Sequence, residues 1–480
     1  MAASIKDVLP STCSVVIPSK DSVLKELLPR RWMQQTSSSL PASIITPSTE
    51  EEIIEVVKYA SANSLRVLPA GGGCSAYVVV NGKTIYLDMQ NFKDVTVDTT
   101  KHVVTVGGGV RWAEIIGKVV EKGYYTAWTH FSSTGVVGSS FGGGLNSFIG
   151  MIGYSCDQIH SARVITAKGD VLTLSHESTG QEKALFNMLR GGGVGLVIVT
   201  SLTLRLHKIS SLDIEEGGKA VDYTAMFPPP AFEYAAELYA KLTPITDKRF
   251  SVGCAIMNAP PGMPISGPVM MISANFIGTL EASKAPLEPL LSEETKSKAL
   301  FVMPKTTELA RMTEQADGRF RNGNADMDAY NAMMTRIPAS TVRAVVQRWI
   351  QFNEESPALA AKSTLVMAGF SNAGPQAADP ERETGFCHRE RRFLGQVIWT
   401  GMTDDEIRLV GPFSEEILAI FRKEDDAHGV PKTVFPNNMR AGTDMTQMYS
   451  TAAKMEAVHE VKQYWDPEGV FWNPAVNGWK

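Results

Sequence analysis

The sequence predicts an α+β fold, and three observations indicate it. Segments typical of helices and of strands alternate up to about residue 210. Longer helical segments and strands with turn residues between them then run to about residue 430, which favours a largely antiparallel sheet with helices. Glycine triplets at 71–73, 142–144 and 191–193 stand among the strand-like segments of the first half, where they mark tight turns or close approaches of the backbone.

The first predicted helix follows residue 49. Ser48 and Glu51 fit a capping box, and Ile53, Val57 and Ala60 form an apolar stripe. Short strands are expected next at 66–69, 84–87 and 103–106, followed by a helix from about residue 111.

A hairpin is the next clear element. Two β-rich runs, 162–166 and 171–174, flank Gly169 and Asp170, a typical two-residue turn. A helix at about 182–189 then leads into the third glycine triplet, and alternating leucines at 202–206 predict a half-buried strand.

The pattern changes near residue 210, which predicts a second domain over 211–430. The helices expected there are 231–242, 340–352 and 415–424, and the strands are 251–257, 269–276, 364–370 and 392–399. Loops are expected at 228–230, 260–261 and 374–382.

Composition excludes several classes of protein. With 46 basic and 51 acidic residues, a net charge of −5 and no basic stripe interleaved with aromatic residues, nucleic acid is not an expected partner. The amino end lacks a signal-peptide pattern and no apolar run approaches membrane-spanning length, so we expect a cytoplasmic protein. Five cysteines without CxxC spacing predict neither a disulfide framework nor a metal site.

The glycine triplets also predict binding of a long anionic ligand. A backbone without side chains can turn its N–H groups toward a phosphate, with no need for basic side chains. Any single triplet is also compatible with a mere turn. A nicotinamide-binding domain is disfavoured, because no Gly-x-Gly-x-x-Gly follows a strand with an acidic residue about 20 positions later.

The order of these motifs resembles one family, the flavin-linked oxidases of the vanillyl-alcohol oxidase and berberine-bridge-enzyme type, with a PCMH-type FAD-binding domain. The resemblance is continuous over 41–208, through the segments 68–75, 106–112, 135–145, 153–157, 164–170 and 189–193. It resumes at 384–389, similar to a strand that faces the flavin in that family, and at 462–471, similar to the family's C-terminal ending.

The resemblance implies FAD as cofactor, bound between two α+β subdomains. It implies an FAD-binding domain at 1–210, an inserted substrate domain at 211–430 and a segment at 431–480 that returns to the first domain. The residues it assigns to FAD are Ala70, Gly71, Gly72, Gly73, Cys74, Ser75, Gly135, Gly138, Gly142, Gly143, Gly144, Asp157, Ile165, Gly193, Val197 and Asn473.

The sequence departs from the family at both flavin-tethering positions, which hold Cys74 and Phe131. The double covalent link is therefore absent. Two alternatives remain for Cys74: a small thiol beside non-covalent FAD, which we expect, or a single sulfur link to the flavin.

A second departure concerns the catalytic base. Where alcohol-oxidising members carry Tyr-x-Asn-Tyr, this chain has Phe435, Pro436, Asn437 and Asn438. The remaining candidates are His388 with its neighbour Arg389, and His130, because imidazole can act as acid or base near neutral pH. An ordinary core or surface role is the alternative for each, and it is the expected one for the other six histidines.

The resemblance implies an FAD-dependent oxidase that transfers a hydride from a substrate carbon to flavin N5 and returns the electrons to O2. The expected substrate is a mid-sized, partly apolar organic molecule such as a secondary-metabolite intermediate. The alternatives are a redox-neutral cyclase or isomerase on the same scaffold, for example closing a ring in a polyene or quinone-like substrate, and a non-catalytic FAD-binding protein.

Overall fold

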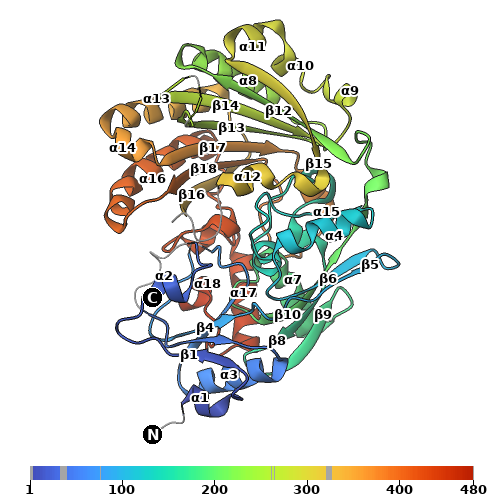
Figure 1. The fold of residues 1–480 in the computed structure, drawn as a ribbon, viewed down its shortest axis with the longest axis vertical. Helices are drawn as coiled ribbons and strands as arrows, with labels where there is room; N and C mark the ends of the chain where they lie inside the picture. Colours follow the sequence, from blue (N-terminus) through green and yellow to red (C-terminus); the bar gives the residue numbers. More distant parts are fainter. Residues whose placement is uncertain are drawn as a thin grey trace.

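The computed structural model describes residues 4–32, 40–75, 77–260, 262–263, 265–319 and 327–478. The chain forms a lower half with two main sheets and both termini, and an upper half built on one large sheet (Figure 1). Helices and sheets of both parallel and antiparallel pairing occur together, so the predicted α+β class is confirmed.

The first sheet of the lower half has the strand order β1-β2-β4-β3. Its strands are β1 (Ser14–Val16), β2 (Ser43–Thr46), β4 (Thr84–Asp88) and β3 (Arg66–Ala70), and β4 pairs in parallel with both β2 and β3. Helix α3 (Glu50–Ala62) packs its fully buried stripe of Ile53, Val57 and Ala60 into the core beside this sheet.

The cap of α3 lies one residue later than predicted. Thr49 is the N-cap, its hydroxyl accepts from the Glu52 N–H at 3.2 Å, and the Glu52 carboxylate accepts from the Ser48 N–H at 2.6 Å. The predicted pair of Ser48 and Glu51 was wrong. Thr49 and Glu52 have the same spacing one position later, and this second pair caps the helix.

The second lower sheet is antiparallel, in the order β5-β6-β10-β8-β9. It contains β5 (Val95–Asp98), β6 (Val103–Gly107), β10 (Ile198–Arg205), β8 (Ile159–Ile165) and β9 (Val171–Ser175). The predicted hairpin is confirmed as β8–β9, with Gly169 at φ +84° in its turn. Helix α7 (Gly180–Gly192) kinks at Arg190 and Gly191, where the third triplet begins.

Short helices complete this half. The helix expected from residue 111 is split at Ile115 into the 3-10 turn η1 (Trp112–Glu114) and α4 (Ile116–Glu121). The other short helices are α1 (Ile5–Val8), α2 (Leu24–Leu27), α5 (Val136–Phe141), α6 (Ile149–Ile152), η2 (Ser155–Gln158) and η3 (Ile209–Ser211). Two short strands, β7 (Tyr124–Tyr125) and β11 (His207–Lys208), pair with each other.

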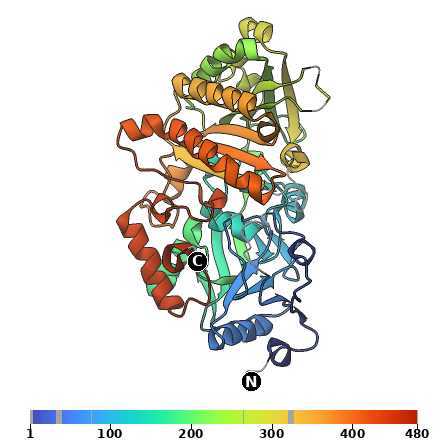
Figure 2. The same cartoon turned by 90° about the vertical axis from the view of Figure 1, so that its left-hand side faces the viewer.

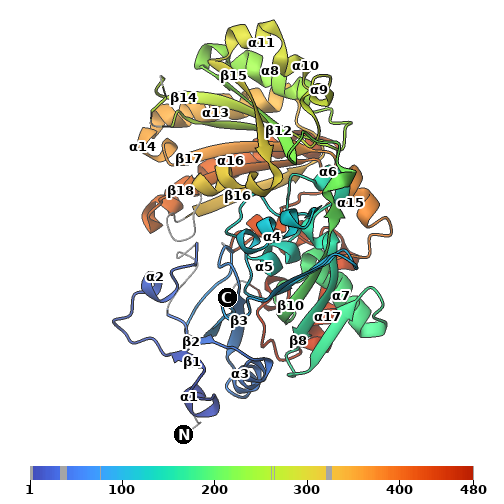
Figure 3. The ribbon, with the colours of Figure 1, turned by 45° about the vertical axis from the view of Figure 1, so that its right-hand side comes forward.

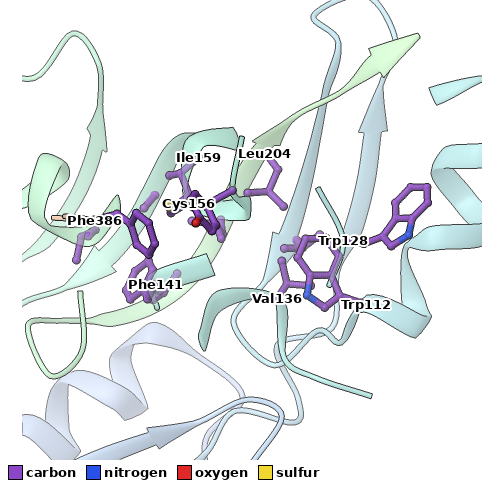
Figure 4. Packing of buried hydrophobic residues seen from close by; sticks show 14 of the residues in the cluster. Trp112, Trp128, Val136, Phe141, Cys156, Ile159, Leu204 and Phe386 are labelled. Carbon is purple, nitrogen blue, oxygen red and sulfur yellow. The ribbon is translucent and has the colours of Figure 1, made fainter. Parts of the chain in front are cut away.

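One apolar core joins η1, α5, η2 and β10 (Figure 4). Trp112, Val136, Cys156 and Leu204 are fully buried in it, although they come from a turn, a helix, a second turn and a strand. Burying a tryptophan or leucine of this kind stabilises the fold by about 1.5–3 kcal/mol per side chain. The core therefore fixes α5 relative to β10.

The upper half is a seven-stranded antiparallel sheet in the order β15-β12-β14-β13-β17-β18-β16. Its strands are β12 (Lys219–Phe227), β13 (Phe250–Asn258), β14 (Pro268–Phe276), β15 (Phe301–Glu308), β16 (Met327–Met334), β17 (Ser363–Phe370) and β18 (Phe393–Thr400). The four strands predicted in this region are thus confirmed to within one residue at every end.

Helices cover one face of this sheet. Helices α8 (Phe232–Leu242), α13 (Ala339–Glu355) and α16 (Asp404–Ala427) share a buried core with it, and α13 and α16 lie in front of the strands in Figure 2. The remaining helices are η4 (Pro229–Ala231), α9 (Leu280–Ser283), α10 (Glu288–Leu291), α11 (Glu293–Lys298), η5 (Leu309–Arg311), α12 (Glu314–Arg319), α14 (Pro357–Ala360) and α15 (Ala373–Ala378).

Three predictions for the second half need correction. Helix α16 begins at Asp404 rather than near 415 and continues through Pro412, because its buried face packs on the sheet. Part of the expected 374–382 loop is the helix α15. Residues 384–389 form irregular backbone rather than a strand, since Gly385 and Phe386 pair with carbonyls of α7.

The chain after residue 430 lies against the lower half (Figure 3). Helix α17 (Ala452–Trp465) packs on α7, and the Val67 N–H of β3 donates to the Val470 carbonyl at 2.8 Å. Elements η6 (Pro436–Asn438), η7 (Met445–Gln447) and α18 (Pro474–Asn477) complete the chain. The exact domain boundaries at 210 and 430 stay predictions. Within the described residues, none of the helices is both long and apolar enough to cross a membrane.

Candidate active site

A cavity of about 320 Å³ lies between the two halves. The lower half contributes the turn that follows β3 and the loop and helix around α5, and the upper half contributes β16 and β18. The upper-half lining is mostly apolar and consists of Met327, Ala329, Leu394, Gln396 and Ile398. A long ligand can therefore contact the glycine turn at one end and the large sheet at the other.

Ten predicted cofactor-binding residues line this cavity. The structure brings together the whole first turn, two glycines at the start of α5 and two residues after α7. They are Ala70, Gly71, Gly72, Gly73, Cys74, Ser75, Gly135, Gly138, Gly193 and Val197.

Two of these glycines meet each other directly. A Cβ on Gly72 would lie 2.2 Å from the Gly135 nitrogen, and a Cβ on Gly135 would lie 2.6 Å from the Gly72 nitrogen. Only two bare backbones can pass at this distance. Gly138 differs, since a Cβ there would meet nothing within 4 Å. Because Gly138 lines the cavity, a side chain at this position would take up ligand space.

Basic side chains lie beside the turn, contrary to our expectation of main-chain donors alone. Arg31 lines the cavity, is 4 % exposed, and donates to the Val78 carbonyl. Arg111 is close enough to Cys74 to interact electrostatically, and its Nε and Nη2 atoms are enclosed without a hydrogen-bond partner. No sequence pattern linked these arginines to the turn, because chain folding alone brings them there.

The second triplet lies behind the wall. A Cβ on Gly142 would lie 2.3 Å from the Asn437 amide, whose Oδ1 accepts from the Gly144 N–H at 2.8 Å. Asn437 itself lines the cavity, and Gly143 packs against Phe435, which also lines it. Gly142, Gly143 and Gly144 therefore position two cavity residues without lining the cavity themselves.

Three further predicted residues also lie outside the lining. The Asn473 amide donates to the Val194 carbonyl at 2.6 Å and so supports the wall segment after α7. Ile165 is fully buried in the core beneath the first sheet. Asp157 is buried and bound to Arg389, with Nη2–Oδ1 at 2.6 Å and Nη1–Oδ2 at 3.1 Å.

His388 and Arg389 are not brought to the cavity. Arg389 is 2 % exposed and bridges Asp157 to Asp379 and Thr384, so it joins the 379–389 segment to the lower half. His388 is fully buried, and burial together with the positive charge of Arg391 lowers its pKa to about 3. The imidazole is therefore neutral at pH 7 and is enclosed away from the cavity lining.

His130 lies in the cavity wall. It is an exposed residue that lines the cavity and has protein atoms around it. Burial lowers the pKa of His130 below its ordinary value, so the ring is neutral at pH 7. Two hydrogen bonds fix the loop that carries His130. The Thr129 and Thr134 hydroxyls lie 2.8 Å apart, and the Ser132 N–H donates to the Asp317 carboxylate of α12 at 2.8 Å.

Several aromatic and polar residues of the wall were not predicted. Trp32, Tyr77, Tyr86, Gln396, Asn438 and Trp472 all line the cavity. Burial raises the pKa of Tyr86 to about 12, so its phenol is protonated at neutral pH. Of these residues, only Gln396 could have been assigned to a face from the sequence, because the alternation of β18 places it on the same face as Leu394 and Ile398.

No carboxylate occurs among the described lining residues, and no group of histidine, cysteine or acidic residues in the described chain could hold a metal ion. The site therefore offers a backbone cradle, arginine near the glycine turn, and one imidazole facing a mainly apolar space. These features fit a dinucleotide with a flat aromatic end.

Comparison with known proteins agrees with this geometry. Residues 41–175 match the family described as FAD binding domain. Residues 41–175 thus carry an FAD-binding domain, and the chain is similar to FAD-linked oxidoreductases over nearly its whole length. It is 25 % identical to FAD-linked oxidoreductase tazG of Aspergillus terreus, over 97 % of this chain and 93 % of that protein. It is also 25 % identical to FAD-linked oxidoreductase srdI of Neurospora crassa, over 97 % and 89 % of the two chains.

Solved structures share the fold of this chain. The BBE-like 1 protein of Physcomitrella patens has a TM-score of 0.79 at 15 % identity and 98 % coverage of both chains. The xylooligosaccharide oxidase of Myceliophthora thermophila, solved with xylobiose, has a TM-score of 0.78 at 18 % identity and 99 % coverage of both. FAD is therefore the cofactor, and the lower half is the part that carries its binding domain.

Proposed function

We propose that this FAD-linked oxidoreductase is an oxidase acting on a mid-sized, partly apolar organic molecule, such as a secondary-metabolite intermediate. The observation that carries the proposal is the cavity, which runs from the glycine turn to an apolar wall on β16 and β18 and includes one neutral imidazole. FAD bound there would accept a hydride, which carries two electrons, from a substrate carbon and would pass these two electrons to O2.

The residues of this chain would hold the cofactor at the turn end. The backbone of Gly71, Gly72 and Gly73 and the guanidinium of Arg31 suit its phosphates, since main-chain N–H groups and arginine both bind oxyanions. The protonated phenol of Tyr86 and the indole of Trp32 add polar and aromatic surface in the same cavity.

His130 would act as the general base. A neutral imidazole facing the cavity can take a proton from a substrate hydroxyl while the adjacent carbon is oxidised. The usual phenols are replaced by Phe435 and Asn438, which line the cavity and cannot serve as bases. Among the described lining residues, His130 is the imidazole available for this step.

The wall favours a weakly polar substrate. Met327, Leu394 and Ile398 offer apolar contact, and Gln396 and Asn438 offer neutral hydrogen-bonding groups. No described lining carboxylate is present to bind a cation or several sugar hydroxyls. The sugar specificity in the name of the xylooligosaccharide oxidase therefore does not extend to this chain in our proposal.

The proposal is tested by mixing the FAD-loaded enzyme anaerobically with aromatic and allylic alcohols, with hydroquinones, and with xylobiose. We expect at least one of the apolar compounds to bleach the visible flavin band, and readmitted O2 to restore it with release of hydrogen peroxide. Xylobiose serves as the comparison substrate. Bleaching by xylobiose alone would contradict the proposed substrate class.

The redox-neutral cyclase is the second candidate, because Cys74 and Phe131 replace both tethers and covalent tethering raises the oxidising power of a flavin. A cyclase would turn over its substrate anaerobically while the flavin band stays unchanged. Product formation without bleaching and without peroxide would replace the oxidase proposal with this one.

A further inference from the structure

Helix α7 lies beside β8, β9 and β10 in the lower half (Figure 1). The chain around these elements carries several basic residues that do not line the cavity. Lys183, Phe186 and Arg190 share one face of α7, since they are spaced by three and four residues. The His176 ring, just after β9, lies 5.0 Å from the Phe186 ring. None of these residues lines the cavity.

Arg190 is the buried member of the group. It is 5 % exposed, and its Nε atom is enclosed without a hydrogen-bond partner. Its guanidinium carbon lies 5.9 Å from the centre of the Phe186 ring, and no carboxylate of the described residues lies within ion-pair distance of it. Burying a guanidinium is costly unless an anion or hydrogen-bond acceptors compensate it.

Arg205 and Lys183 bring two more cations to the same place. The Arg205 Nη2 donates to His176 Nε2 at 2.8 Å, and the Lys183 ammonium donates to the His176 carbonyl at 3.2 Å. Burial and the positive charges of Arg190, Arg205 and Lys183 lower the pKa of His176 to about 4. The imidazole is therefore neutral, and the positive charge of the group remains on the arginines and the lysine.

Asp157, the carboxylate that interacts with Arg205, already has other partners. Asp157 interacts electrostatically with Arg205, but both of its oxygens accept hydrogen bonds from Arg389, and Oδ2 also accepts from the Tyr154 N–H at 2.8 Å. Among the described residues, no ion pair within 4.0 Å involves Arg190, Arg205 or Lys183. The charge of this group is thus left for a ligand to compensate.

We propose that Arg190, Arg205 and Lys183 form a binding site for a free inorganic oxyanion of the phosphate or sulfate type. Guanidinium groups match such oxygens with paired N–H donors, and the lysine adds a third positive charge. Arg190 stands at the kink of α7, directly before the glycines that lead to Gly193 in the cavity wall. A bound anion would therefore hold the turn that ends at the cofactor wall.

The site is tested by titrating inorganic phosphate into the FAD-loaded protein at constant ionic strength, with chloride as the balancing salt. Isothermal calorimetry and the thermal unfolding midpoint follow binding. We expect saturable binding in the millimolar range, with sulfate competing. Arg205→Gln should weaken it at least tenfold, and Lys183→Met serves as a second variant if the first does not fold.

Lys118→Gln is the matched control, since Lys118 is an exposed cation on α4 and lies outside the group. It should bind phosphate like the wild-type protein. Three outcomes would overturn the proposal: no saturable binding, equal binding by both variants and the wild type, or binding of phenyl phosphate without binding of free phosphate. The test does not depend on the oxidase activity, so the two proposals fail separately.

Discussion

His130 is the residue on which the proposed chemistry depends most. We expect His130→Gln to retain FAD and fold but to lower kcat/KM by about 10²–10⁴, the usual contribution of a general base. His459→Gln, an exposed histidine on α17, should leave kcat/KM unchanged. Steady-state kinetics on an oxidised substrate measure both.

The pH dependence of kcat/KM gives a second measure of His130. Because burial lowers the pKa of His130, its neutral form persists below the ordinary value of 6.5. Activity should therefore be retained through neutral pH and be lost as the pH falls through the lowered pKa. An acidic limb that persists in His130→Gln would assign the base to another group.

Cys74 decides how the cofactor is held. Its Sγ atom lies 3.5 Å from the Gly72 carbonyl within the turn, and we expect FAD to be non-covalent. Acid precipitation should then leave the yellow colour in the supernatant for wild type and Cys74→Ser alike. Colour that stays in the wild-type pellet and disappears from the pellet of the variant would demonstrate a sulfur link instead.

At the scale of elements, the ion pair between Asp157 and Arg389 joins the η2 turn to the irregular 384–389 segment. Arg389→Met leaves a buried carboxylate without its partner, so we expect a loss of about 3–5 kcal/mol in the free energy of unfolding. Lys284→Gln, in an exposed pair with Glu281, should leave the free energy of unfolding essentially unchanged. Denaturant unfolding measures both variants.

Asp379 makes this connection sensitive to acid. Burial raises the pKa of Asp379, whereas the hydrogen bond from Thr384 and the charge of Arg389 lower it. The two lowering effects together are larger, so the pKa lies below the ordinary value of 3.8. A carboxylate with a lowered pKa stabilises the folded state above its unfolded pKa. This contribution is lost as the pH falls through the lower, folded value.

Elements with a regular pattern could be predicted from the sequence, and those set by tertiary contacts could not. The alternation in β13, β14, β17 and β18 located these strands closely, and Gly169 located the β8–β9 hairpin. The start of α16 was missed because Gly411 and Pro412 interrupt the helical pattern, while the buried face that holds the helix together is visible only in the fold.

The candidate site divides in the same way. The turn at residues 70–75 could be predicted, since glycine is required where two backbones pass at the Gly72–Gly135 contact. The positions of Arg31 and Gln396 in the cavity could not be predicted, because each residue comes from a segment distant in the sequence. Position 388 has a histidine in a matching motif, yet the irregular backbone there turns the imidazole into the core rather than into the cavity lining.

At the scale of the whole molecule, the two halves act together. The lower half supplies the glycine turn and α5, and the upper half closes the cavity with β16 and β18. The account therefore requires that FAD lie in this cavity, along the wall where Gly138 leaves open space.

The FAD content of purified Gly138→Leu, compared with wild type and with Gly117→Leu, tests this claim most directly. Gly117 is an exposed glycine of α4 with equally open surroundings, so it controls for the cost of the substitution in a helix. We predict one FAD per chain in the wild type and in Gly117→Leu, and a folded, colourless Gly138→Leu. Full FAD occupancy in Gly138→Leu, or a colourless wild type that takes up no FAD in excess, would contradict the account.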